Sequence, residues 1–270
     1  DAISTGTQNV AIGSNALGTG VTATNNVAVG RASMAATLGS ENVAVGVNTL
    51  AANQGGSHSV AIGSAALTAQ NPASGNVDFY NVAVGSSAGT AITTGTKNTL
   101  IGGLAGDALN TGGANVAVGY AALSTEDGNG NNVAVGYLAL TTQNTGADGH
   151  NTGVGHKAGR NITTGVQNTF VGALVGDAST EGVHNVAMGY AALTTDTKGN
   201  YSVAIGAGAL ATQNFTTATS AYNVCVGEDA GNDITTGIGN TLIGGLAGDV
   251  LNDADSNTAV GYLALTADTL

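Results

Sequence analysis

Few side chains in this sequence are of a type that could do chemistry. The histidines are His58, His150, His156 and His184. Their spacing matches no metal-binding motif. Glu126–Asp127 and Glu228–Asp229 are adjacent acidic pairs, and paired carboxylates hydrolyse glycosidic bonds, but neither pair has an evident acid or base partner. The sequence therefore predicts no catalytic residue, no metal centre and no cofactor, and we do not expect an enzyme.

Three aspartates recur at one position of a long repeat: Asp107, Asp177 and Asp249. Calcium-binding solenoids place an aspartate on every turn, whereas this chain places one on every fourth turn. A continuous calcium ladder is therefore not expected, and only an isolated cation site stays open.

Cys225 is the only cysteine, so no disulfide can form within the chain. We interpret it as a small packed side chain rather than a nucleophile.

The composition favours a thin, layered interior over one bulky core. Of the 270 residues, 44 are glycine, 8% are charged and none is tryptophan. The net charge of −12, with five scattered basic residues, argues against nucleic-acid binding and against an anionic membrane surface. It favours solubility, with a cation or a cationic partner as the alternative. No apolar run reaches the length of about 18 residues that a membrane span needs, so no membrane insertion is expected.

A five-residue motif, Asn-Val-Ala-Val/Ile-Gly, recurs through the whole chain, mostly at intervals of 16 or 17 residues. Its fifteen copies begin at residues 9, 26, 42, 59, 81, 98, 115, 132, 151, 168, 185, 202, 223, 240 and 257. A repeat of this length is too short for a helix pair and fits one turn of a β-solenoid. The sequence therefore predicts an all-β, parallel β-solenoid of about fifteen coils.

The coils are grouped in sets of four. Longer intervals follow Gly63, Gly136 and Gly206. They divide the chain into the blocks 9–80, 81–150, 151–222 and 223–270. We interpret residues 1–270 as a single solenoid domain and as a piece of a longer fibre.

The alternation within the motif indicates two faces of a strand. Successive side chains point to opposite faces, so we expect Val10 and Ile12 to point into the coil and Ala11 to point outward. The alanine column would then let identical chains approach each other around a rotation axis. The alternative is that this face packs under the chain's own turns. Larger residues interrupt the column in second coils, and we predict that they fill the axis of a homotrimer: Leu100, Phe170 and Leu242.

Asparagine begins thirteen of the fifteen motif copies, and Ser59 and Ser202 begin the other two. Stacked coils place equivalent side chains about 4.8 Å apart, so their amides can bond from coil to coil. The predicted ladder consists of Asn9, Asn26, Asn42, Asn81, Asn98, Asn115, Asn132, Asn151, Asn168, Asn185, Asn223, Asn240 and Asn257. The motif glycine is expected at a tight corner with positive φ.

The long connections after the fourth coils are the predicted recognition segments, because insertions in a solenoid map to one surface and carry function. The candidate binding residues are Gln70, Gln143, Gln213, Phe79, Tyr80, Phe215 and Tyr222. The alternative is that these connections cover a gap or brace adjacent subunits.

The motif followed by Ala-Leu, as in Asn115–Leu123 and Asn257–Leu265, resembles the repeat in the heads of YadA-type trimeric autotransporter adhesins. It is also similar to repeats in bacteriophage tail fibres. The resemblance spans essentially the whole chain. It implies a left-handed parallel β-roll, a homotrimer and display on a virion or a cell surface.

These observations together predict the shaft or head of a trimeric surface fibre, either a phage tail fibre or a bacterial adhesin. Its partners would be two further copies of the chain and a host-surface glycan or envelope protein, bound weakly and multivalently. A structural filament or spacer without a ligand is the alternative.

Overall fold

The computed structural model of the protein describes residues 5–18, 22–72 and 75–266. These residues form an all-β structure with about 14 turns of parallel β-solenoid, and none of them lies in a helix. The all-β solenoid predicted from the repeat is confirmed.

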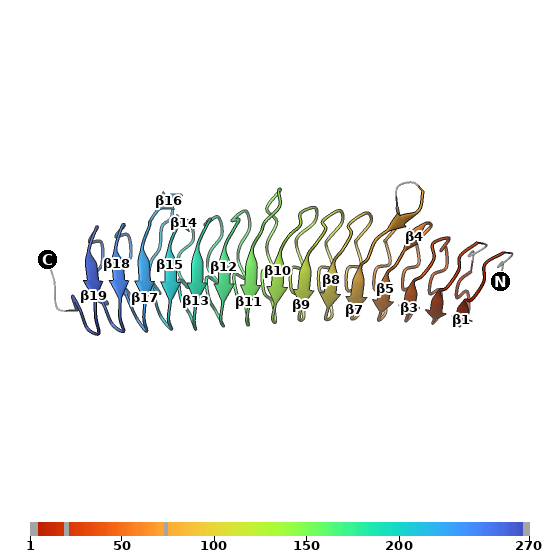
Figure 1. Ribbon diagram of the computed structural model, residues 1–270, viewed down its shortest axis with the longest axis horizontal. Helices are drawn as coiled ribbons and strands as arrows, with labels where there is room; N and C mark the ends of the chain where they lie inside the picture. The colour runs from red at the N-terminus through yellow and green to blue at the C-terminus, as the bar shows by residue number, and fades with distance from the viewer. Residues whose placement is uncertain (1–4, 19–21, 73–74, 267–270) are drawn as a thin grey trace. The chain divides into compact units, whose positions relative to one another are not determined.

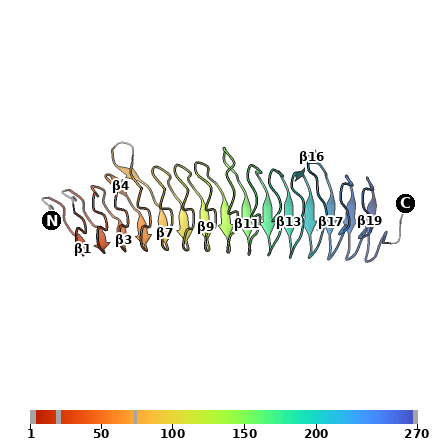
Figure 2. The same cartoon turned by 180° about the vertical axis from the view of Figure 1, so that it is seen from behind.

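The chain comprises two units, residues 1–132 and residues 133–270. In both, the motif strands lie side by side and run parallel (Figures 1 and 2). Those of the first unit are β1 (Val10–Ile12), β2 (Val27–Val29), β3 (Val43–Val45), β5 (Val60–Ile62), β7 (Val82–Val84), β8 (Thr99–Ile101) and β9 (Val116–Val118). Those of the second are β10 (Val133–Val135), β11 (Thr152–Val154), β12 (Thr169–Val171), β13 (Val186–Met188), β15 (Val203–Ile205), β17 (Val224–Val226), β18 (Thr241–Ile243) and β19 (Thr258–Val260).

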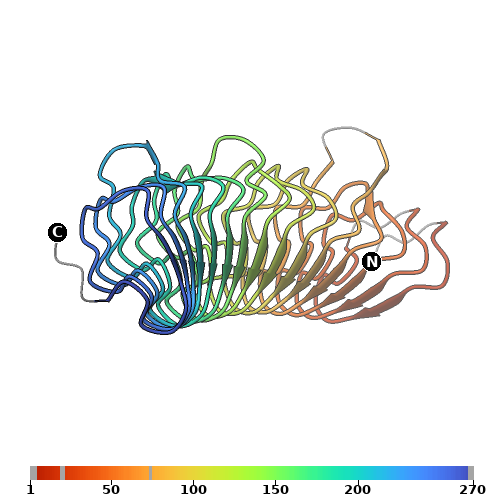
Figure 3. The same cartoon turned by 60° about the vertical axis from the view of Figure 1, so that its left-hand side comes forward.

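Equivalent residues of successive motifs pair with each other in each unit. In the first unit, Ala11 pairs with Ala28. In the second, Phe170 pairs with Ala187. The motif strands form one wall of each stack, and the remaining residues of every coil close the turn (Figure 3). Successive coils therefore repeat the same contacts.

The orientation of the motif side chains is the reverse of the expected one. The central alanines, such as Ala28 and Ala44, are fully buried. The flanking β-branched side chains point outward, and Val45 and Ile62 are 36% and 39% exposed. In the first coil Val10 and Ile12 are 45% and 60% exposed, and Ala11 is exposed as well. The cause is the narrow interior, which the leucine of the Ala-Leu pair already fills. A Cβ atom at Gly153, the central position of its motif, would lie 2.8 Å from Leu140 Cγ.

Leu100, Phe170 and Leu242 consequently lie inside their own coils, where each is fully buried. Their predicted place on an outward face is wrong. In these second coils a glycine replaces the leucine of the Ala-Leu pair, which leaves room for a larger central side chain. A Cβ atom added to Gly176 would lie 2.7 Å from the ring of Phe170. These residues therefore complete the packing of the interior.

The motif glycines form a corner at which successive coils approach closely. Gly30 has a φ of +129°, a conformation that side chains rarely adopt. A Cβ atom there would lie 2.3 Å from the carbonyl oxygen of Gly46 in the next coil. Both the backbone conformation and the lack of space therefore require glycine.

The motif asparagines form a buried ladder in both units. Asn98 donates from its backbone N–H and its Nδ2 to Asn81 Oδ1, at 2.9 and 3.2 Å. Asn168 bonds to Asn151 Oδ1 in the same way, at 2.9 and 3.1 Å. The amides of Asn98 and Asn168 also donate to the backbone carbonyls of Gly112 and Gly182, each 14 residues later in the chain. The ladder thus satisfies buried amides and ties successive turns together.

Candidate functional site

The long connections carry short strands of their own. In the first connection, β6 (Val77–Asp78) pairs with β4 (Gly56–Ser57) of the preceding coil. In the third, β16 (Thr219–Ser220) pairs with β14 (Gly199–Asn200). Both connections stand out beyond the neighbouring coils of their own unit (Figure 3). Residues 73–74 of the first connection lie outside the described residues.

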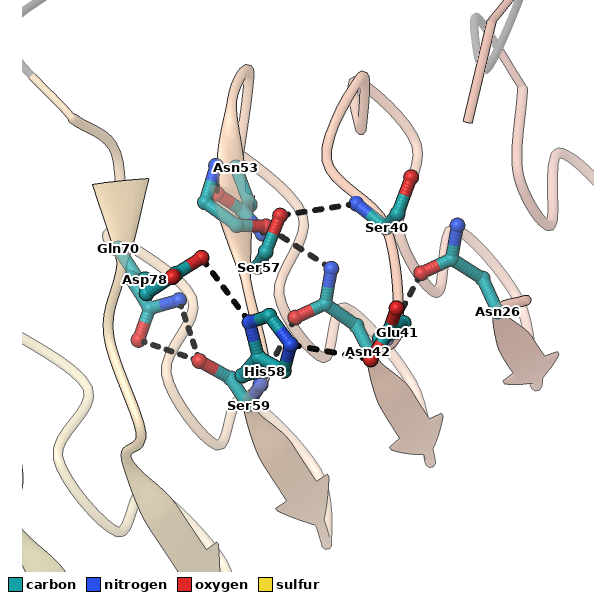
Figure 4. A network of polar contacts seen from close by, with 11 residues as sticks. Asn26, Ser40, Glu41, Asn42, Asn53, Ser57, His58, Ser59, Gln70 and Asp78 are labelled. Carbon is teal, nitrogen blue, oxygen red and sulfur yellow. Dashed lines mark hydrogen bonds and ion pairs between the residues drawn. The ribbon is translucent and has the colours of Figure 1, made fainter. Parts of the chain in front are cut away.

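The three glutamines predicted to bind a ligand are buried and belong to the asparagine ladder. Gln70 Nε2 donates to Ser59 Oγ at 2.9 Å (Figure 4). Gln70 Oε1 accepts from Asn81 Nδ2 at 2.9 Å. Most motifs begin with asparagine, whereas this one begins with Ser59. The amide of Gln70 therefore takes the place of the missing asparagine amide. Gln143 Oε1 accepts from Asn151 Nδ2 at 3.2 Å.

Gln213 repeats this arrangement and adds a buried carboxylate. Its Nε2 donates to Ser202 Oγ at 3.1 Å and to Asp196 Oδ2 at 2.6 Å. The other oxygen of Asp196 accepts the backbone N–H groups of Gly199 and Phe215, both at 3.0 Å. Burial raises the pKa of Asp196, and these hydrogen bonds oppose the shift. Asp196 thereby fastens the third connection to the preceding coil.

The two phenylalanines of the connections are also buried. Phe79 is fully buried against Gly56, where a Cβ atom would lie 2.5 Å from Phe79 Cε2. Phe215 takes the same place against Gly199, at 2.9 Å. Phe79, Phe215 and the three glutamines therefore anchor the connections, and their predicted role as exposed ligand contacts is wrong. The physical reason is that the coil interior takes up these side chains. The two rings pack against Gly56 and Gly199, and the glutamine amides bond to side chains at the motif starts.

Tyr80 and Tyr222 are the two candidate binding residues that face solvent, with exposed fractions of 52% and 59%. Each directly precedes a motif asparagine. Tyr80 stacks on His58 with ring centroids 5.0 Å apart. Tyr222 stacks on Tyr201 at 5.1 Å with an angle of 11° between the ring planes. Each ring therefore stacks on the ring at the equivalent position of the preceding coil.

His58 lies between two carboxylate groups. Its Nε2 lies 3.0 Å from Glu41 Oε2, and its Nδ1 lies 3.0 Å from Asp78 Oδ1 (Figure 4). Only a doubly protonated imidazole donates to both carboxylates. His58 thus connects the first long connection, through Asp78, to the coil that contains Glu41.

The other histidines make separate contacts. His156 stacks on Tyr137 at 5.6 Å, and His184 stacks on Tyr201 at 5.1 Å. His150 Nδ1 lies 3.2 Å from the carbonyl oxygen of Asp148. Within the part of the chain that the structure describes, no group of three or more histidine, cysteine, aspartate or glutamate side chains is arranged to hold a metal ion.

The recurring aspartates lie on three separate coils and have different surroundings. Asp177 Oδ1 accepts a hydrogen bond from Thr194 Oγ1 at 2.6 Å. Burial raises the pKa of Asp107.

The adjacent acidic pairs make local hydrogen bonds. Glu126 accepts from Asn129 Nδ2 at 2.7 Å, and Asp229 accepts from Asn232 Nδ2 at 3.1 Å. These bonds brace corners of the coils.

Cys225 occupies the central position of its motif and is fully buried. Burial raises the pKa of its thiol to about 12. Because the thiolate is the reactive form, this cysteine is a packing residue in the folded chain.

No helix in the described ranges has the length and the apolar character of a membrane span. Comparison of the sequence with known protein families gives no match, and a search of curated proteins gives none either.

Proposed function

We propose that the chain is a segment of a homotrimeric surface fibre, with left-handed coils and with long connections that contact a host surface. The observation that carries the proposal is the outward face of the motif strands. Valine and isoleucine side chains follow one another along this face in each unit, in place of the predicted alanine column.

In the first unit the exposed side chains of this face include Val10, Ile12, Val45, Ile62 and Ile101. In the second unit they include Val186, Met188, Ile243 and Val260. We call this set the valine–isoleucine face. Contiguous apolar surface is unusual on a monomeric soluble protein and marks an interaction site.

A second copy of the chain is the partner that fits this face best. The face repeats at the coil spacing, so an identical face around a symmetry axis matches it in period and in chemistry. The net charge of −12 favours solubility, but it does not remove the apolar face from contact with water. Three copies around an axis would cover the valine–isoleucine face and leave the connections outside.

Recognition is assigned to the connections because they extend beyond the coils and carry exposed Tyr80 and Tyr222. The partners are a glycan or an envelope protein of a host surface, and the location is a virion tail fibre or a cell surface. Weak contacts would add up across the copies of a fibre. No catalytic step or cofactor forms part of this proposal.

Sedimentation analysis tests the assembly. We expect the wild-type chain to sediment at three times its chain mass, and Ile62→Lys or Met188→Lys to shift it toward the monomer. Gln54→Lys, an exposed site away from this face, is the matched control and should stay trimeric. A wild-type chain that is monomeric at micromolar concentration would refute the trimer.

A structural spacer without a ligand is the second candidate. The burial of Phe79, Phe215 and the three glutamines favours it, because these residues serve the fold. Removing residues 75–80 tests the two candidates against each other. Unchanged attachment of the fibre to host surfaces after this deletion, and after the equivalent deletion of 214–222, supports the spacer.

A further inference from the structure

In each unit, the residues directly before the motif starts lie in an outward column, which we call the pre-motif column. Its members have left-handed backbone conformation, as in His184, Tyr201 and Tyr222, with φ of +57°, +60° and +52°. This conformation directs the side chain away from the buried asparagine that follows it. In the second unit, three successive coils place an aromatic ring in this column.

These three rings form a continuous stack. The centroids of His184 and Tyr201 are 5.1 Å apart with 9° between the ring planes, and those of Tyr201 and Tyr222 are 5.1 Å apart with 11°. Tyr222 is the end member, and its exposed fraction of 59% exceeds the 40% of Tyr201. Since Tyr201 covers one face of the Tyr222 ring, the opposite face is directed toward the next coil.

The next coil leaves that face uncovered. Its pre-motif residue is Gly239, whose N–H donates to the carbonyl oxygen of Ala221 at 2.8 Å, directly beside Tyr222. The nearest atoms to a Cβ atom at Gly239 would belong to Ser256, at 3.5 Å or more. Gly239 is thus a gap in the column, with Tyr222 on one side and exposed Ser256 on the other.

The size of the gap matches one ring. Two coil spacings separate Tyr222 from Ser256, about 9.6 Å. This is close to twice the 5.1 Å spacing of the rings already in the stack. A ring that stacks on Tyr222 would therefore lie beside Gly239 and reach the hydroxyl of Ser256. Asp255, also exposed, accepts the backbone N–H of Ile238 through Oδ1 at 2.7 Å, which places its carboxylate beside Gly239 and Ser256.

We propose that Tyr222, Gly239, Ser256 and Asp255 form a binding site for one neutral hexopyranose unit of a surface glycan. The C–H face of the sugar stacks on Tyr222, and its hydroxyl groups bond to Ser256 and Asp255. Asp255 and the net charge of −12 disfavour an anionic sugar. The inference rests on the proposed role in host-surface recognition and names the ligand class and the residues.

Saturation-transfer NMR on the full chain tests the site, with methyl β-D-galactopyranoside and methyl β-D-glucopyranoside as probes. We expect transfer to at least one of them in the wild type, and at least fivefold weaker transfer to glucuronic acid. Tyr222→Ala should abolish the transfer, whereas Tyr222→Phe should keep it because the ring face remains. Gly239→Tyr should also abolish it, since a tyrosine there fills the gap.

Folding of the variants is expected, because alanine and tyrosine are both compatible with this conformation. Ala114 is a pre-motif residue with a φ of +56°, and the tyrosines at the same repeat position are Tyr80, Tyr201 and Tyr222. Tyr190→Ala removes an exposed tyrosine outside the stack and is the matched control. Absence of transfer in the wild type overturns the site, as does equal transfer in wild type, Tyr222→Ala and Gly239→Tyr. Sedimentation of the same samples separates the outcomes, since a trimer without sugar binding refutes only the site.

Discussion

The ring of Phe170 occupies the space beside Gly176, where an added Cβ atom would lie 2.7 Å from Cε2 and Cζ of the ring. Leu242 stands in the same relation to Gly248, at 2.8 Å. A large residue in the motif strand and a glycine in the opposite wall are therefore complementary in volume.

This complementarity predicts a compensating pair of substitutions. Phe170→Ala should lower the free energy of unfolding by about 3–5 kcal/mol, because it leaves a cavity. Gly176→Leu alone should lower it by about 1–3 kcal/mol through overpacking. The double variant should recover at least half of the combined loss, since Leu193 occupies the equivalent place in the next coil with a φ of +52°. Urea unfolding in a double-mutant cycle measures the coupling, and strict additivity would contradict it.

The Asp196 carboxyl group predicts a pH dependence of stability. Burial raises its pKa above 3.8 in the folded chain, so the folded chain binds the proton more tightly than the unfolded chain. The resulting stabilisation is present below about pH 3.8 and is lost as the pH rises through the folded pKa. Asp196→Asn removes this contribution and keeps an oxygen for the N–H groups of Gly199 and Phe215.

The unfolding temperature of Asp196→Asn minus that of the wild type should therefore be higher at pH 7 than at pH 4. Calorimetry at the two pH values measures it. A difference that does not change with pH would show that Asp196 is not coupled to folding in this way.

Gln70 is expected to stabilise the fourth coil of the first block. Gln70→Leu leaves the hydroxyl of Ser59 without its 2.9 Å donor and removes one of the two acceptors of Asn81 Nδ2, which keeps the carbonyl oxygen of Gly95 at 2.8 Å. Unpaired buried polar groups cost about 1–3 kcal/mol each. We expect a loss of that size in urea unfolding and faster amide exchange at residues 75–80. Gln54→Leu, an exposed glutamine in the same unit, should change stability by less than about 0.5 kcal/mol.

His58 should control the first connection locally rather than the stability of the unit. His58→Ala removes both 3.0 Å contacts, to Glu41 and to Asp78, whose side chains are more than half exposed. Exposed ion pairs contribute about 0–1 kcal/mol, so the unfolding midpoint should hardly move. Limited proteolysis at residues 75–80 should accelerate severalfold, whereas His184→Ala should leave that cleavage unchanged. Equal cleavage of wild type and His58→Ala would show that the contacts do not hold the connection.

The regular spacing of the motif was sufficient to predict the solenoid and the register of its coils. It could not predict which face of the strand is the interior, because alternation defines two faces and does not rank them. The width of the coil decides which face of the strand points inside. That width depends on where Leu140 and its equivalents lie. Hence Ala28 and Phe170 are inside, and Val10 and Ile12 are outside.

The candidate site was predicted only in part for a related reason. Glutamine in a connection suggests exposure, yet in this fold a column of amides is the interior. A signal for this was present in the sequence, since Ser59 and Ser202 are each followed by a glutamine eleven residues later. The stack of His184, Tyr201 and Tyr222 is visible only when the residues before each motif are aligned by coil.

Phe170 and Gly176 belong to the same coil, six positions apart in the sequence. A gene duplication that copies whole coils carries both partners of the fit together, and the new coil meets neighbours whose backbone it already matches. A crossover between the two positions would separate them and leave either a void or a clash. Steric volume therefore constrains where a duplicated segment can begin and end, and such a solenoid can change length only in whole turns.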